Sequence, residues 1–168
     1  MGLDITAYRQ ISKAIDPKME DGCPVDWQNH FQAHESSIDF TEENWPGRSA
    51  GVERGAVYMF AESFGFRAGS YRGYNEWRRW LSDFAEYDDI ETAWKTTSGP
   101  FIELINFADN EGVIGSAVAA KLAKDFADNQ ERAERFNPGD GRLWWLTQYQ
   151  NWRKAFEMAP DNGAVEFH

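Results

Sequence analysis

Residues 2–9, Gly-Leu-Asp-Ile-Thr-Ala-Tyr-Arg, alternate between apolar and polar side chains. Leu3, Ile5 and Ala7 fall on one side of an extended chain, and the residues between them fall on the other. A period of two is typical of a strand that buries one face and leaves the other in contact with water. We therefore predict a first strand at residues 2–9 that packs on a core.

Further strand and helix patterns follow along the chain. Apolar and β-branched or aromatic runs predict strands, and apolar spacings of three and four predict helices. The expected strands lie at residues 31–40, 56–62, 101–107 and 164–168. The expected helices lie at residues 74–86, 89–95, 116–137 and 141–159. Because residues 101–107 are apolar at almost every position, we expect that strand in the centre of the sheet.

Two segments are expected to lack regular structure. Residues 16–24 combine prolines, a glycine and acidic side chains, which predicts an exposed loop. Residues 64–73 place three glycines among aromatic side chains, which predicts a tight connection. We place Ser116 at the N-cap of the helix that follows residue 115.

This order of elements defines the expected fold class. Early strands, a helix pair, a central strand, two helices and a final strand predict an α+β protein. We expect a mixed or antiparallel sheet of about four to five strands packed against three to four helices. No linker divides the chain, so residues 1–168 are expected to form a single domain.

Composition limits the classes of partner. The 168 residues carry a net charge of −11, which disfavours non-specific binding to nucleic acid and to anionic membranes but is compatible with mimicry of nucleic acid. No apolar stretch approaches the roughly 20 residues that a membrane-spanning helix needs. The single cysteine, Cys23, and the lack of a signal-peptide pattern predict a cytoplasmic protein. We expect no cofactor.

Arginines are concentrated in residues 64–81, which contain four of them and one acid. Together with the neighbouring aromatic and hydroxyl groups they could bind a phosphate or stack on a nucleobase. The alternative is that the aromatic rings belong to the core and the arginines pair with surface acids. The ligand-binding candidates here are Arg67, Ser70, Tyr71 and Arg72.

A second polar group follows the expected central strand. Asp109, Asn110 and Glu111 could bind a ligand at the end of that strand, or could simply form a turn and cap the next helix. The calcium-loop pattern is absent. His30 and His34 lack the order and flanking residues of a zinc motif, so we expect no metal site.

Two glutamates lie inside otherwise apolar segments. Glu62 and Glu103 could form a paired general acid and base if they are buried together. The alternative is that each one points to solvent or pairs with an arginine. No catalytic motif decides between these interpretations, so an enzyme is less expected than a binding protein.

Candidates for partner binding come from the surface of the expected helices. Trp144 lies one position away from the apolar stripe of the last helix and could anchor a partner protein. Asp88, Asp89 and Glu91 contribute to an acidic surface near the start of a short helix.

Four blocks of sequence carry a resemblance to a known family. They are residues 1–8 (MGLDITAY), residues 66–71 (FRAGSY), residues 104–112 (LINFADNEG) and residues 163–168 (GAVEFH). Together they resemble an uncharacterised family of bacteriophage and prophage proteins. The resemblance implies a setting in the cytoplasm of a host cell and no particular chemistry.

Three functions are compatible with these observations. The first is a non-enzymatic phage accessory protein that modulates a host protein, for example a defence-system inhibitor whose acidic surface mimics nucleic acid. The second is a nucleotide-binding or small-molecule-binding protein, or a hydrolase, with its site between residues 67–79 and 109–111. The third is a self-associating subunit of a phage-encoded assembly.

Overall fold

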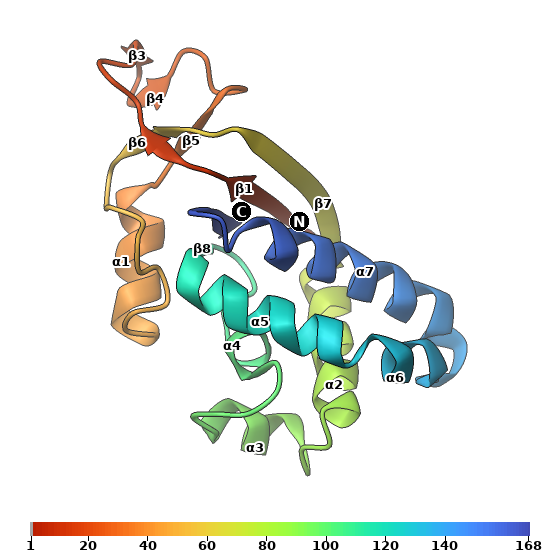
Figure 1. Cartoon of the computed structure of the whole chain (residues 1–168). Coiled ribbons are helices and arrows are strands. Elements are labelled where there is room, and N and C mark those ends of the chain that lie inside the picture. Colours follow the sequence, from red (N-terminus) through yellow and green to blue (C-terminus); the bar gives the residue numbers. More distant parts are fainter. Residues whose placement is uncertain (1) are drawn as a thin grey trace.

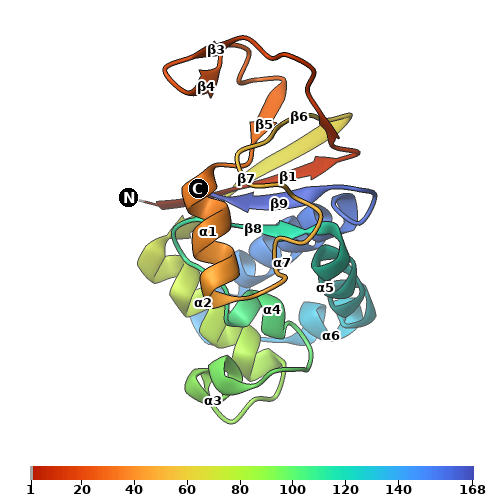
Figure 2. The same ribbon diagram turned by 90° about the vertical axis from the view of Figure 1, so that its left-hand side faces the viewer.

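The computed structural model describes residues 2–168, and its main sheet has four antiparallel strands. We call it sheet A. Its strand order is β7 (Glu62–Ser70), β1 (Gly2–Arg9), β9 (Ala164–Phe167) and β8 (Gly112–Gly115). The first and last strands therefore lie side by side in the middle of the sheet, as Figure 2 shows. The fold is α+β, as the order of sequence patterns predicts.

Two small sheets lie on one side of sheet A. The first has the order β2 (Ser12–Lys13), β6 (Val57–Met59) and β5 (His30–Gln32). The second is the hairpin of β3 (Met19–Glu20) and β4 (Cys23–Pro24). This hairpin belongs to residues 14–29, which connect β2 to β5 and which we call the arm. The arm projects from the body of the molecule in both views (Figures 1 and 2).

Helices cover the opposite face of sheet A. The long ones are α2 (Tyr71–Phe84), α5 (Ser116–Asp128) and α7 (Arg142–Met158). Shorter elements complete the structure: α1 (Glu35–Asn44), α3 (Ile90–Lys95), α4 (Ile102–Ile105), α6 (Gln130–Arg135) and the 3-10 helix Gly139–Gly141. Within residues 2–168, none of these helices has the length and apolar character needed to cross a bilayer.

The two faces of sheet A bury two separate cores. On the helical face, Leu3, Ile5 and Ala7 pack among buried aromatic rings that include Trp77 and Trp152. This confirms the buried face predicted for residues 2–9. On the other face, which we call the outer face, a smaller cluster joins β1 to the small sheets and α1; it includes Tyr8, Phe31, Ile38 and Tyr58.

Several predicted elements are wrong. The segment expected to be a strand at 31–40 contains only the short β5 and then forms α1, whose first turn begins at Glu35. Residues 101–107 form no strand; Ile102–Ile105 make one buried helical turn, entered through a left-handed Phe101 with φ 59°. An apolar run with no polar face has no period, so its sequence does not distinguish a buried strand from a buried helix.

The glycine-rich segment also differs from its prediction. Residues 62–70 form β7, which pairs with β1 along its whole length, and not a tight connection. Gly69 has φ 124° where the pairing shifts register, and a side chain there would contact the Trp144 ring. Later, the helix expected at 116–137 divides at Asn129 into α5 and α6, and its N-cap is Gly115 instead of Ser116.

Candidate functional site

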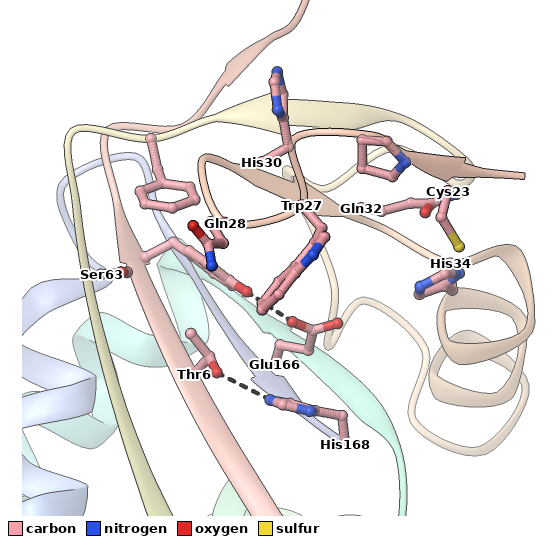
Figure 3. Close-up of a pocket in the computed structure, with 13 residues that line it drawn as sticks. Thr6, Cys23, Trp27, Gln28, His30, Gln32, His34, Ser63, Glu166 and His168 are labelled. Carbon is pink, nitrogen blue, oxygen red and sulfur yellow. Dashed lines mark hydrogen bonds between the residues drawn. The ribbon is translucent and has the colours of Figure 1, made fainter. Parts of the chain in front are cut away.

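A cavity of about 330 Å³ lies between the outer face of sheet A and the arm. Its floor is formed by Thr6 of β1 and by Glu166 and His168 at the end of β9. Its opposite wall includes Cys23 and Trp27 of the arm. Figure 3 shows these side chains around one space. The cavity therefore lies between the central strands of sheet A and the arm.

Strand alternation directs polar side chains to this floor. Neighbours of Glu166 on β9, Val165 and Phe167, are buried in the core on the helical face, so Glu166 points to the outer face. Thr6 is its direct partner across the β1–β9 pair and points the same way. Two short strands thus bring residues from opposite ends of the chain together in one site.

The Glu166 carboxyl group has a pKa well above its ordinary value. The Tyr8 hydroxyl donates a hydrogen bond of 2.9 Å to Glu166 Oε2. Burial raises the pKa of Glu166 to about 7, although the Tyr8 hydrogen bond opposes part of this rise. Burial and the adjacent Glu166 also raise the pKa of Tyr8. Glu166 therefore changes protonation near neutral pH and can accept a hydrogen bond or a positive charge.

A second contact holds the edge of the floor. His168 Nε2 lies 2.9 Å from Thr6 Oγ1 (Figure 3). Burial lowers the pKa of His168, and the nearby Asp4 carboxylate opposes this shift. The ring is thus mainly neutral at pH 7, where it can donate or accept a hydrogen bond.

The walls supply aromatic rings and no cationic lysine or arginine. Trp27 lies on the arm with 70% of its surface exposed, and Phe60 lies beside the Tyr8 ring at a centroid distance of 5.0 Å. Among the described residues that line the cavity, none is a lysine or an arginine. Among the described side chains of the floor, Glu166 is the one carboxylate.

The arm above the cavity also has an unusual surface. Seven large apolar side chains within residues 2–168 are exposed, and four of them lie on the arm. They are Ile15, Met19, Val25 and Trp27, with exposed fractions of 93%, 45%, 54% and 70%. Met59 is also exposed, in the strand that pairs with β2 and β5.

The arginine-rich segment is divided between several structural roles. Arg67 on β7 donates to Asp4 at 3.0 Å on the neighbouring strand. Ser70 is the N-cap of α2, where its hydroxyl accepts from the Gly73 amide at 3.1 Å. Tyr71 is half-buried and Arg72 is exposed at the start of the same helix.

The loop at residues 109–111 contacts α2 at Asn75 and Arg78, which lie further along the helix than Tyr71 and Arg72. The Asp109 carboxylate accepts from Asn75 at 2.8 Å and lies 3.8 Å from the buried Arg78 guanidinium. Asn110 is exposed, and Glu111 accepts from the Ser37 hydroxyl at 3.3 Å. The structure thus joins this loop to Arg78 and Asn75, whereas Arg67 is engaged by Asp4.

The other acids considered from the sequence have cationic partners. Glu62 accepts from Arg9 at 3.0 Å, and Glu103 accepts from Lys121 at 2.5 Å. This arrangement agrees with separate ion pairs and gives no support to a shared acid and base. Among the described residues 2–168, no three histidine, cysteine, aspartate or glutamate side chains form a group suited to a metal ion.

The candidates for partner binding lie on the helical layer. Trp144 is half-buried and packs edge-on against Trp80 at 5.4 Å. Asp89 caps α3 by accepting from the Thr92 amide at 2.6 Å, while Asp88 and Glu91 are exposed. Trp144 therefore contributes mainly to packing of α7 on α2.

Sequence reasoning missed the Tyr8–Glu166 site. The available signal was the single acid in the apolar segment Ala164–Phe167, opposite the polar positions of residues 2–9. What the sequence lacked was the pairing of the two strands. No family model, curated protein or solved structure matches the chain.

Proposed function

We propose that the protein is a non-enzymatic binding protein that docks on a partner protein through the arm. The observation that carries this proposal is the concentration of exposed apolar side chains on residues 14–29. Single exposed apolar residues are common on protein surfaces, and it is their concentration on one projecting segment that favours an interaction site. Burying each such side chain in an interface contributes about 1.5–3 kcal/mol relative to leaving it in water.

Charge on the arm defines the chemistry of the partner. Four acids, Asp16, Glu20, Asp21 and Asp26, alternate along the arm with the apolar residues, and Lys18 is the one cation of residues 14–29. The whole chain has a net charge of −11. We therefore expect a partner with an apolar groove bordered by lysines and arginines, and association that is steered by charge.

The resemblance to phage and prophage proteins supports a host protein as this partner. In that setting the protein would act in the host cytoplasm, for example as an inhibitor of a defence system. A basic groove that normally holds nucleic acid would match the acidic arm. Self-association through the arm, as in a phage-encoded assembly, is the competing use of the same surface.

A second candidate function rests on a different cavity. Asn75, Arg78, Arg79 and Asp109 line a space of about 240 Å³ between α2 and the 109–111 loop. A small anionic ligand such as a nucleotide would find arginine and amide donors there. This candidate is weaker because the Arg78 guanidinium already donates to the carbonyls of Ile105 and Phe107.

The docking proposal can be tested by comparative capture from host lysate. Tagged wild-type protein is compared with the double variant Ile15→Ser/Val25→Ser and with the control Leu143→Ser, which changes an exposed apolar residue of α7. We expect one protein to be retained by the wild type and the control at low salt, and lost with the arm variant and at high salt. Equal retention of the same proteins by the arm variant would contradict the proposal.

A further inference from the structure

We propose that the cavity between sheet A and the arm binds an organic ammonium ion, with the Glu166 carboxylate as counter-ion and the Trp27 indole as the apolar wall. Trp27 is the one residue that this site shares with the exposed apolar group of the arm. Ile15 and Val25, which are exposed on the arm, do not line the cavity, and Glu166 is not part of the exposed apolar group.

The first argument is electrostatic. Glu166 is a partly buried acid, and within residues 2–168 its carboxyl group receives one side-chain hydrogen bond, from Tyr8. A buried carboxylate without a cationic partner is costly, and the described lining residues include no lysine or arginine to pair with it. A ligand cation would supply the missing charge. An anionic ligand would instead meet a carboxylate and find no permanent positive charge.

The second argument concerns the walls. Tyr8, Trp27 and Phe60 contribute aromatic rings to the cavity, and such rings attract cations through their negative faces. Of these rings, the tryptophan indole attracts cations most strongly. Trp27 extends over the floor from the arm, near the Glu166 carboxyl group (Figure 3). An alkylated ammonium suits this combination because its carbon shell contacts the rings while its charge is balanced by the carboxylate.

The third argument is selectivity against metal ions. Glu166 is the one carboxylate side chain among the described lining residues, and no three acidic, histidine or cysteine side chains of residues 2–168 are arranged as metal ligands. A hard metal cation needs six or more oxygen ligands, whereas an ammonium ion needs few. The volume of about 330 Å³ falls at the small end of the range for ligand cavities, which suits a compact cation.

Protonation of Glu166 should be linked to binding. The pKa of about 7 means that part of the population is neutral in the empty protein at neutral pH. A bound cation favours the carboxylate, so binding releases a proton and strengthens as pH rises. The other titratable groups that face this cavity are Tyr8 from β1, His30 from β5, Cys23 from β4, His34 before α1 and His168 directly after β9.

Because several titratable groups face the cavity, the pH profile needs a variant that isolates the acid. In wild type, the affinity should rise about tenfold between pH 6 and pH 8, following the ionised fraction of a group with a pKa near 7. In Glu166→Gln, which keeps the shape of the side chain, most of this increase should disappear.

The test is titration calorimetry of the full chain with tetramethylammonium chloride and with n-butylammonium chloride, against sodium chloride of equal ionic strength. We expect saturable binding at pH 8 that weakens at least tenfold in Glu166→Gln and in Trp27→Leu. Trp94→Leu is the matched control, because Trp94 is an exposed tryptophan of α3 away from the cavity. Circular dichroism establishes that each variant is folded.

The result that would overturn the proposal is a lack of binding by folded wild type, or equal binding by Glu166→Gln. A lysine-containing peptide, titrated with and without tetramethylammonium, distinguishes the sources of the ammonium group. Binding of the peptide that the small ion displaces identifies a lysine side chain, and binding of the small ions alone identifies a free amine. Ile15→Ser/Val25→Ser should retain ammonium binding even if it loses the partner protein, so the two proposals fail separately.

Discussion

The Tyr8 hydroxyl donates a 2.9 Å hydrogen bond to the Glu166 carboxyl group, although the two residues are 158 positions apart in the sequence. The bond exists because β1 and β9 are neighbours in the centre of sheet A. It places a titratable acid under the arm, next to the surface that we propose as the docking site. The chemistry of the site therefore depends on how the two ends of the described chain pair.

Glu166 should make the stability of the protein depend on pH. Its folded pKa of about 7 lies above the ordinary value of 4.5, so the folded state binds the proton more tightly than the unfolded state. Its contribution to stability is thus present below pH 4.5 and is lost as pH rises to 7. Glu166→Gln should be more stable than wild type at pH 8 by about 1–3 kcal/mol and nearly equal to it at pH 4. Urea unfolding at both pH values measures this difference; the same difference at both would contradict the assignment.

Arg78 should be a structural residue. Its buried guanidinium donates to the Phe107 carbonyl and to Asn75, and lies over the Tyr74 ring at 4.8 Å. Arg78→Met would leave that carbonyl unpaired, which should cost about 2–4 kcal/mol in the free energy of unfolding. The exposed Arg79, changed to Met, is the control and should stay within about 0.5 kcal/mol of wild type. If Arg78→Met changed the free energy of unfolding only slightly, the structural role would be contradicted and the nucleotide site described above would be favoured.

Gly163 should be essential to the pairing of β9 with β1. A Cβ atom at this position would lie 2.0 Å from the Tyr8 carbonyl oxygen, in rigid backbone. Gly163→Ala should therefore destabilise the protein by more than about 2 kcal/mol. Gly65→Ala is the control, because a Cβ there would meet no atom closer than 3.7 Å. Thermal unfolding compares the two, and an unchanged midpoint for Gly163→Ala would contradict a close contact between residue 163 and the Tyr8 carbonyl.

Ser70 should act as a helix cap. Its hydroxyl accepts from the Gly73 amide at the start of α2, so Ser70→Ala should reduce stability by about 1 kcal/mol. Ser70→Asp, which restores an acceptor, should recover most of the loss. If Ser70→Ala left stability unchanged but altered binding of a phosphate ligand, the original ligand-binding hypothesis for this residue would be preferred.

The sequence predicted the parts of the fold that have a clear period. The alternation in residues 2–9 and the apolar stripes of α2 and α7 identify elements that bury one face, and the structure confirms them. It did not predict α4, because an apolar run buried on all sides has no polar face to mark its period. It also missed β8, whose four residues are too few for a pattern.

The candidate site was harder to predict for a different reason. Tyr8 and Glu166 each look unremarkable within their own strand, and only the pairing of β1 with β9 makes them neighbours. Arg67 and Asp109 are ligand-binding candidates in the sequence because they are charged, but their side chains pair with Asp4 and Asn75. Local sequence identifies polar residues but not the strand neighbours that give them a function.

The measurement that tests the docking proposal most directly is site-specific photo-cross-linking in host cells. A photoreactive amino acid is placed at Val25 on the arm, or at Leu143 on α7 as the control, since both side chains are exposed. We expect a single prominent cross-linked protein from position 25, with a basic surface at the cross-linked peptide, and none from position 143. Cross-links at position 143 but not at position 25 would contradict docking through the arm.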